Sequence, residues 1–77
     1  MREPEGFRET IGDIREFFGM EVQMLTVGQV AKYLSCDHRT VKRLIEKKRL
    51  QAANIGSGKY EIYRIPIKAL ARFMTKK

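Results

Sequence analysis

The first apolar pattern along the chain predicts a short amphipathic helix over residues 10–19. Thr10 is a candidate N-cap, and Asp13 follows it three residues later, a spacing typical of a helix start. Gly19 is a typical stop. The apolar residues with helical spacing are Phe7, Ile11, Ile14 and Phe18. Because this segment is short, we expect the helix to persist only if it packs against another element.

A second helical pattern covers residues 26–34. Thr26 stands at its start and Gln29 follows at the third helical position, which is the spacing of a capping box. The apolar stripe of this segment comprises Val27, Val30, Ala31 and Leu34. The pattern therefore predicts a short helix with one face toward the core.

A third helical pattern covers residues 37–48, after a connection of only Ser35 and Cys36. Asp37 suits the N-cap position, and its charge suits the positive end of a helix dipole. The apolar stripe is Val41, Leu44 and Ile45. At about 100° per residue the opposite face carries Arg39, Arg43 and Glu46, flanked by Thr40, Lys42 and Lys47. Two short helices joined by a tight turn, the second basic on its outer face, predict a helix-turn-helix.

Residues 50–65 change to a strand-like pattern. The runs 50–55 and 60–65 flank the sequence GSGK, which predicts a hairpin with a four-residue loop. Pro66 ends the second strand, and apolar spacing after it predicts a last helix. The expected fold class is α+β, mostly α: a small winged helix-turn-helix domain with a two-stranded hairpin wing and an extra N-terminal amphipathic helix.

The aromatic residues and the methionines are interpreted as core side chains. Tyr60 and Tyr63 suit a pleated, half-buried surface in the hairpin. We expect them, with Tyr33, Phe73 and the methionines, to pack inside the domain and not to form a platform for stacked bases.

Charge divides the 77-residue chain into two parts. Residues 1–24 contain three basic and six acidic side chains, whereas residues 25–77 contain thirteen basic and three acidic ones. We therefore divide the chain into an acidic N-terminal extension, 1–24, and a basic domain, 25–77. A compact basic module favours polyanionic partners, with nucleic acid first and an acidic membrane surface second.

The adjacent residues Cys36, Asp37 and His38 raise the question of a metal or catalytic site, and they include the only cysteine and the only histidine. A zinc site needs about four ligands, which three neighbours at a turn do not supply. A catalytic Cys–His pair needs mutual hydrogen-bond reach and a substrate cleft, for which so short a chain leaves little room. We expect no metal, no cofactor and no enzymatic activity, with Cys36 as a small apolar plug under the turn.

The basic outer face of the third helix is the candidate site. In a helix-turn-helix, residues near the start of the second helix reach base edges in the major groove, where arginine can bind guanine through two hydrogen bonds. The expected DNA-binding residues of the helix and its end are Arg39, Lys42, Arg43 and Lys47. At the wing, Ser57 and Lys59 are expected to meet a phosphate or to enter a minor groove, and a plain hairpin turn without DNA contact is the alternative.

Several separated segments from Leu25 to Phe73 resemble the excisionase-family DNA-binding domains, small winged helices related to the MerR-type helix-turn-helix. The matching residues are Leu25-Thr26, Val30-Ala31 with Leu34, Thr40-Val41, Arg43-Leu44-Ile45, Leu50 with Ala52, Gly56, Arg64-Ile65-Pro66 and Ala69-Leu70. The chain departs from the family's pattern at Ser35 and Lys48, where glycine is usual, and in a wing that is a few residues longer.

The resemblance implies a winged helix that binds double-stranded DNA through its second helix and its wing, in a mobile element or phage. Such proteins bend DNA as accessory factors for a site-specific recombinase, or they repress transcription. By position, the resemblance adds His38 and Thr40, at the start of the third helix, and Arg64, at the base of the wing, to the DNA-facing residues. It implies duplex DNA as partner, together with a recombinase or a second copy of the chain.

An alternative stays open at this point: a winged helix that uses its N-terminal helix to bind another protein, without specific DNA binding. Nothing in the sequence reads as a signal peptide or a membrane span, so the expected location is the cytoplasm, at the nucleoid.

Overall fold

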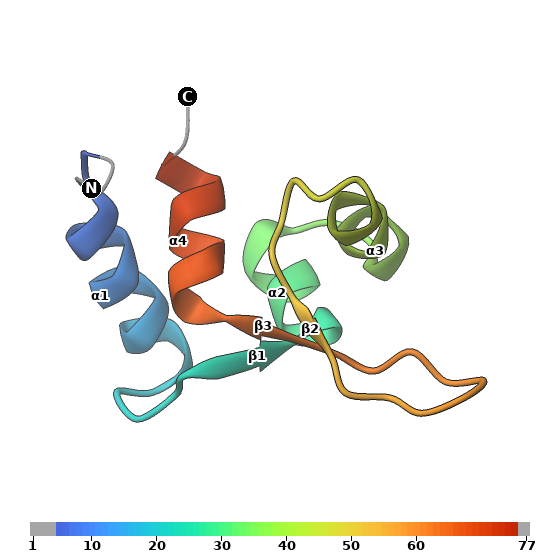
Figure 1. The fold of residues 1–77 in the computed structure, drawn as a ribbon. Helices are drawn as coiled ribbons and strands as arrows, with labels where there is room; N and C mark the ends of the chain where they lie inside the picture. The colour runs from blue at the N-terminus through green and yellow to red at the C-terminus, as the bar shows by residue number, and fades with distance from the viewer. Residues whose placement is uncertain (1–4, 76–77) are drawn as a thin grey trace.

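The structure is a computed structural model that describes residues 5–75; residues 1–4 and 76–77 lie outside the described part. The elements are α1 (Phe7–Phe18), β1 (Met24–Thr26), α2 (Val27–Leu34), α3 (His38–Glu46), β2 (Ala53–Asn54), β3 (Tyr63–Pro66) and α4 (Ile67–Thr75) (Figure 1). The expected α+β class and winged helix-turn-helix architecture are confirmed.

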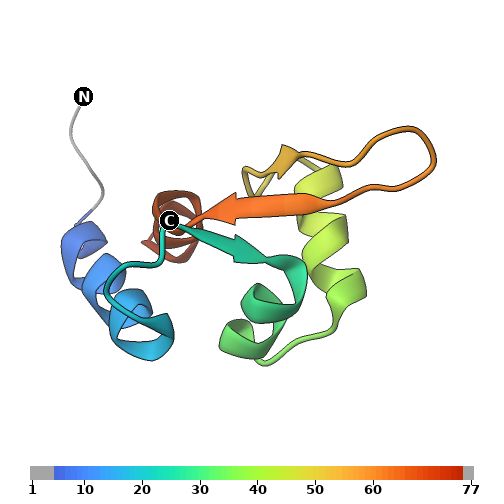
Figure 2. The same cartoon turned by 90° about the horizontal axis from the view of Figure 1, so that it is seen from below.

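A small antiparallel sheet in the order β1-β3-β2 connects the helices to the wing. β3 is central: Ile65 pairs with Leu25 of β1, and Arg64 pairs with Ala53 of β2. Leu25 and Ile65 are fully buried on the face that the helices cover. Figures 1 and 2 show the helices on one side of the sheet and the other side uncovered. The sequence pattern missed β1, because three residues are too few to display a strand period.

The core takes residues from all four helices. Phe7 and Ile14 of α1 are buried in the same cluster as Val30 of α2, Val41 of α3 and Leu70 of α4. The main packing partner of α1 is α4. The α1 helix therefore packs against another element, as expected for a segment too short to persist alone.

The bounds of α1 differ from the predicted 10–19. The helix begins three residues earlier, after Gly6 in a left-handed conformation (φ 80°), and Thr10 lies inside it. The Thr10 N–H donates to the carbonyl of Gly6, the N-cap residue, at 2.9 Å, and so makes the first backbone hydrogen bond of the helix. The early start has a packing cause, since it brings the buried Phe7 onto the core-facing side. The end at Gly19 agrees with the prediction.

The start of α2 agrees with the prediction in detail. The Gln29 N–H donates to the Thr26 hydroxyl oxygen at 3.1 Å, and the Thr26 N–H donates to the Gln29 side-chain oxygen at 2.9 Å. Both bonds of the capping box are therefore present, and they satisfy two backbone donors that the helix itself cannot.

The two helices of the helix-turn-helix end in the same way. Ser35, after α2, has φ 55°, and Lys48, after α3, has φ 60°, so both are left-handed. The N–H groups of Ser35 and Cys36 donate to carbonyls of the last turn of α2 at 3.2 and 2.9 Å. Those of Lys48 and Arg49 donate to the last turn of α3 at 3.0 and 2.9 Å. This is the Schellman pattern, in which glycine is usual at the left-handed position. The chain thus keeps the turn geometry with side chains in place of both glycines.

The strands of the wing are shorter than the predicted runs, and the predicted four-residue loop is wrong. Regular pairing stops at Asn54 and Tyr63. The Asn54 side-chain oxygen accepts the N–H groups of Gly56 and Ile62, at 3.0 and 3.3 Å, so these donors leave the regular ladder. The chain then reverses at its tip, where the Tyr60 N–H donates to the Ser57 carbonyl at 3.3 Å.

Candidate nucleic-acid interface

The outer face of α3 is basic and exposed, and its inner face packs on the core. Val41 is fully buried, and Leu44 and Ile45 are half-buried against the core cluster. All the residues that sequence analysis selected on this helix and its C-cap are exposed: His38, Arg39, Thr40, Lys42, Arg43 and Lys47. The fold therefore leaves all six accessible to an external partner.

The cations of this face have no internal counterion. Within residues 5–75, Arg39, Lys42, Arg43 and Lys47 form no ion pair or side-chain hydrogen bond. Glu46 lies on the same helix without pairing with any of them in that part of the chain. An exposed arginine keeps its charge at any physiological pH and presents five N–H donors. These side chains can therefore meet an external anion without breaking an existing pair.

Asp37 occupies the N-cap position of α3, as predicted, but its side chain makes no capping hydrogen bond. The backbone carbonyl of Asp37 instead accepts the N–H groups of Thr40 and Val41 at 3.1 and 3.2 Å. The start of α3 is thus held by the backbone, whereas the start of α2 is held by side chains.

His38, the first residue of α3, lies against the first turn of α2. A Cβ atom added to Gly28 would stand 3.4 Å from both Cε1 and Nε2 of the imidazole. The absence of a side chain at Gly28 therefore leaves the space in which the ring rests. His38 sits at the seam between the two helices.

Cys36 agrees with its interpretation as an apolar plug. It is half-buried, packs against the core cluster and carries a free thiol. In the described part of the chain, no three histidine, cysteine, aspartate or glutamate residues are grouped so that they could hold a metal ion.

The wing tip brings Ser57 and Lys59 into solvent, and both are exposed. Gly58 has φ 62°, whereas Lys59 is not left-handed. With the bond between Tyr60 and Ser57, this matches a type II′ turn, in which glycine takes the first central position. The tip is a tight two-residue reversal that displays Lys59.

Arg64 is the most constrained of the selected residues. It lies in the central strand, is half-buried, and its Nη1 donates to the Tyr63 carbonyl oxygen at 3.3 Å. Arg64 thus sits at the base of the wing, between β1 and β2.

The acidic residue of the wing is engaged by a neighbour. The Tyr63 hydroxyl donates to Glu61 Oε2 at 3.0 Å. This hydrogen bond is the main reason why the pKa of Tyr63 is raised, with burial and the negative charges of Glu61 and Glu46 adding to it. Tyr63 therefore stays neutral, and Glu61 is held beside it at the base of the wing.

Sequence analysis placed Tyr60 and the methionines in the core, and this is wrong for Tyr60 and for the exposed Met20, Met24 and Met74. Tyr60 is 74% exposed, and Ile55 and Ile62 of the wing are 60% and 43% exposed. The strand period suggested a half-buried surface, but the hairpin extends beyond the helices and no element covers it (Figures 1 and 2). The wing is a few residues longer than the family's pattern, and this extra length was the feature of the sequence that could have indicated a projecting, exposed tip.

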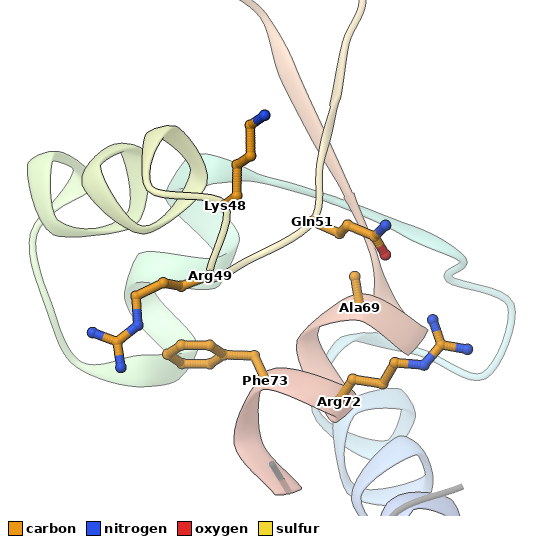
Figure 3. Close-up of a pocket in the computed structure, with 6 residues that line it drawn as sticks. All are labelled: Lys48, Arg49, Gln51, Ala69, Arg72 and Phe73. Atoms are coloured by element: carbon orange, nitrogen blue, oxygen red, sulfur yellow. The ribbon is translucent and has the colours of Figure 1, made fainter. Parts of the chain in front are cut away.

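A second group of cations lies beyond the end of α3. Lys48, Arg49 and Arg72 line a cavity of about 230 Å³ together with Gln51, Ala69 and Phe73. In Figure 3 the Lys48 side chain points away from α4, and the guanidinium groups of Arg49 and Arg72 lie on opposite sides. These cations therefore do not converge on one point, and Arg72 lies over the Phe7 ring of α1, 5.8 Å from its centre.

No helix among the described residues is long and apolar enough to cross a membrane. Residues 24–77 match the helix-turn-helix domain family, so the chain belongs to that family. The family is of the excisionase type, in agreement with the resemblance seen in the sequence, and it is a DNA-binding family, not a family of enzymes. The chain is accordingly a DNA-binding helix-turn-helix protein. Comparison with curated proteins and with solved structures found no match.

Proposed function

We propose that this chain binds a specific duplex sequence, in the cytoplasm at the nucleoid of its host. There it serves either as a DNA-bending accessory factor for a site-specific recombinase or as a small transcriptional regulator of a mobile element or phage. Residues 25–77 form the DNA-binding unit in this proposal, and residues 1–24 form an acidic extension.

The observation that supports specific binding is the unpaired basic face of α3. Arg39 and Arg43 lie one turn apart, opposite the buried Val41, and no side chain within residues 5–75 neutralises either. In this arrangement α3 enters the major groove, the two arginines read base edges, and Lys42 and Lys47 bind the flanking phosphates. Lys59 contacts the backbone or the minor groove from the wing.

The test is selection of bound sites from a random pool of duplex DNA, followed by footprinting on the selected sequence. We expect a defined motif, and we expect affinity to fall with salt, with a log–log slope near −0.9 for each phosphate neutralised. Recovery of no motif, with equal binding of all duplexes, would contradict sequence-specific function.

The division of labour between base and phosphate contacts gives a sharper prediction. Arg43→Ala should weaken binding to the selected site by about 1–3 kcal/mol and relax the preference at one base pair. Lys59→Ala should weaken binding to all duplex sequences similarly. It should also reduce the log–log slope of affinity against salt by about the contribution of one phosphate. Fluorescence anisotropy on matched and mismatched duplexes measures both effects.

Lys32→Ala is the control for this experiment, since Lys32 is an exposed cation of α2 and does not belong to the proposed recognition helix. It should leave specificity unchanged. If Arg43→Ala bound the selected site as well as the wild type, the assignment of the recognition face would be wrong.

A second function, protein binding through the N-terminal helix, has one supporting observation. Phe17, at the end of α1, is 55% exposed, and Met20 just beyond it is 74% exposed, on a segment that also carries exposed acidic residues. If this were the sole function, a mobility-shift experiment with random duplex at low salt would show no binding.

A further inference from the structure

The wing concentrates large apolar side chains in solvent. Ile55, Tyr60 and Ile62 are 60%, 74% and 43% exposed, and all three belong to one eight-residue segment between β2 and β3. Single exposed apolar residues are ordinary, but a group on one projecting element marks a contact surface. Figures 1 and 2 show this segment extending away from the helices, so no other part of the fold covers it.

The three side chains are held in a defined arrangement. The Ile55 N–H donates to the Ile62 carbonyl at 2.8 Å, so the two isoleucines lie opposite one another across the hairpin. Tyr60 follows the two-residue reversal at the tip. The hairpin is also narrow at Gly56, where an added Cβ atom would collide with the backbone at Tyr60 and Ile62. The result is a thin, preformed projection with apolar sides.

The surroundings of this projection favour duplex DNA as its partner. Lys59 lies at the tip beside Tyr60. Glu61, the acidic residue of the segment, accepts a hydrogen bond from the Tyr63 hydroxyl. Figures 1 and 2 both show α3 and the projecting hairpin on the side of the molecule opposite α1, so the apolar residues lie on the same side as the surface proposed to bind DNA. A second copy of the chain fits less well, since a stable protein interface buries more than about 1,000 Å² and three side chains on a thin hairpin supply little of that.

We propose that Ile55, Tyr60 and Ile62 form an apolar wedge that enters the minor groove next to the site of α3, partly unstacks a base step and bends the duplex. This inference rests on the DNA-binding function proposed above. The minor groove has apolar sugar walls between two rows of phosphates, which suits apolar side chains next to a lysine. Inserted apolar residues are a common means by which minor-groove proteins kink DNA. Pyrimidine–purine steps unstack most easily, so one should occur where the wing binds.

The test compares the wild type with the double variant Ile55→Ser/Tyr60→Ser on the selected duplex. Energy transfer between dyes on the duplex ends reports bending, and 2-aminopurine placed under the wing reports unstacking. We expect the double variant to lose both the bending and the unstacking signal and to bind roughly tenfold more weakly. It should keep the base preference set by Arg43. Tyr60→Phe, which retains the ring, should keep both signals.

Met20→Ser is the matched control, because Met20 is as exposed as Tyr60 (74%) but follows α1, outside the wing. It should change neither signal. Circular dichroism checks that each variant is folded, and exposed positions make loss of folding unexpected.

The outcomes separate the wedge from the function on which it rests. If the wild type bound no duplex at all, both proposals would fall. If the wild type bound its site and the double variant bent and unstacked that duplex equally, the wedge alone would be overturned. The wedge would also be overturned if the double variant changed only the sedimentation of the free protein, because the apolar surface would then join copies of the chain.

Discussion

At the α1–α4 side of the molecule most large side chains contact one another, whereas at the α3–wing side they extend into solvent. Phe7 is buried with the Arg72 guanidinium 5.8 Å from the centre of its ring, and Ile14 is fully buried. The rings of Phe17 and Phe18 lie 5.2 and 5.6 Å from that of Tyr33, which joins α1 to α2. Across the molecule, the arginines of α3 have no partner within residues 5–75, and the apolar residues of the wing have no cover.

This difference predicts that stability and the proposed DNA binding depend on different parts of a very small protein. Contacts inside the α1–α4 side contribute to the free energy of unfolding. The arginines of α3 have no partner within residues 5–75 and the exposed wing residues lie outside the core cluster, so truncation of these side chains should leave that free energy nearly unchanged. Substitutions on each side of the molecule, and at the turn between them, can test this separation.

The largest effect is expected for Ile14→Ala. Truncation of this fully buried side chain should lower the free energy of unfolding by about 2–5 kcal/mol, because it loses burial and leaves a cavity between α1 and the core. Urea denaturation followed by circular dichroism measures the loss. Arg39→Ala is the comparison variant on the other side, and it should stay within about 0.5 kcal/mol of the wild type. Equal losses in the two variants would remove the distinction between the sides.

An intermediate effect is expected at the helix starts. Thr26→Ala removes the hydroxyl oxygen that accepts the Gln29 N–H, and it should cost about 1 kcal/mol of stability. Asp37→Ala should cost less, because Asp37 makes no side-chain cap bond and contributes mainly through its charge at the helix dipole. Thermal denaturation of the two variants at matched pH gives the order. A larger loss for Asp37→Ala would mean that its carboxylate caps α3 in solution.

The smallest effect, and one of opposite sign, is expected at the turn that joins the two helices. Ser35→Gly should stabilise the protein by several tenths of a kcal/mol, since glycine adopts a left-handed conformation without the cost of about 1–2 kcal/mol that other residues bear. Part of that gain is lost to the greater freedom of glycine in the unfolded chain. Ser35→Ala should not stabilise, and its melting temperature provides the control. Stabilisation by both variants would point to the hydroxyl, not to the backbone, as the source of the cost.

Much of this fold could be predicted from the sequence because its local signals are explicit. The capping-box pair Thr26 and Gln29 fixed the start of α2, and the apolar spacing around Val41 fixed the orientation of α3. What failed depends on contacts between distant residues. The start of α1 follows from the burial of Phe7 against other elements, and β1 exists because Leu25 pairs with Ile65, forty residues away.

In the candidate site, too, the features of a single helix could be predicted, and those that depend on the arrangement of elements could not. The basic face of α3 is a property of one helix, so spacing alone placed Arg39 and Arg43 together. The exposure of Tyr60 depends on how far the hairpin extends past the helices, which no local pattern contains. Residue types typical of a half-buried strand therefore predicted the wrong environment for Tyr60. Tyr60 is also one of the three residues of the proposed apolar wedge.

The close approach at Gly56 has a consequence for engineering this protein. Asn54 and Gly56 set the geometry at the base of the projection, the first through two hydrogen bonds and the second through its lack of a side chain. The residues between Gly56 and Glu61 are exposed and contribute nothing to the core. Residues 57–60 can therefore be replaced by other tip sequences without redesigning the domain, and such replacements would show whether the tip sets the proposed preference for a DNA groove.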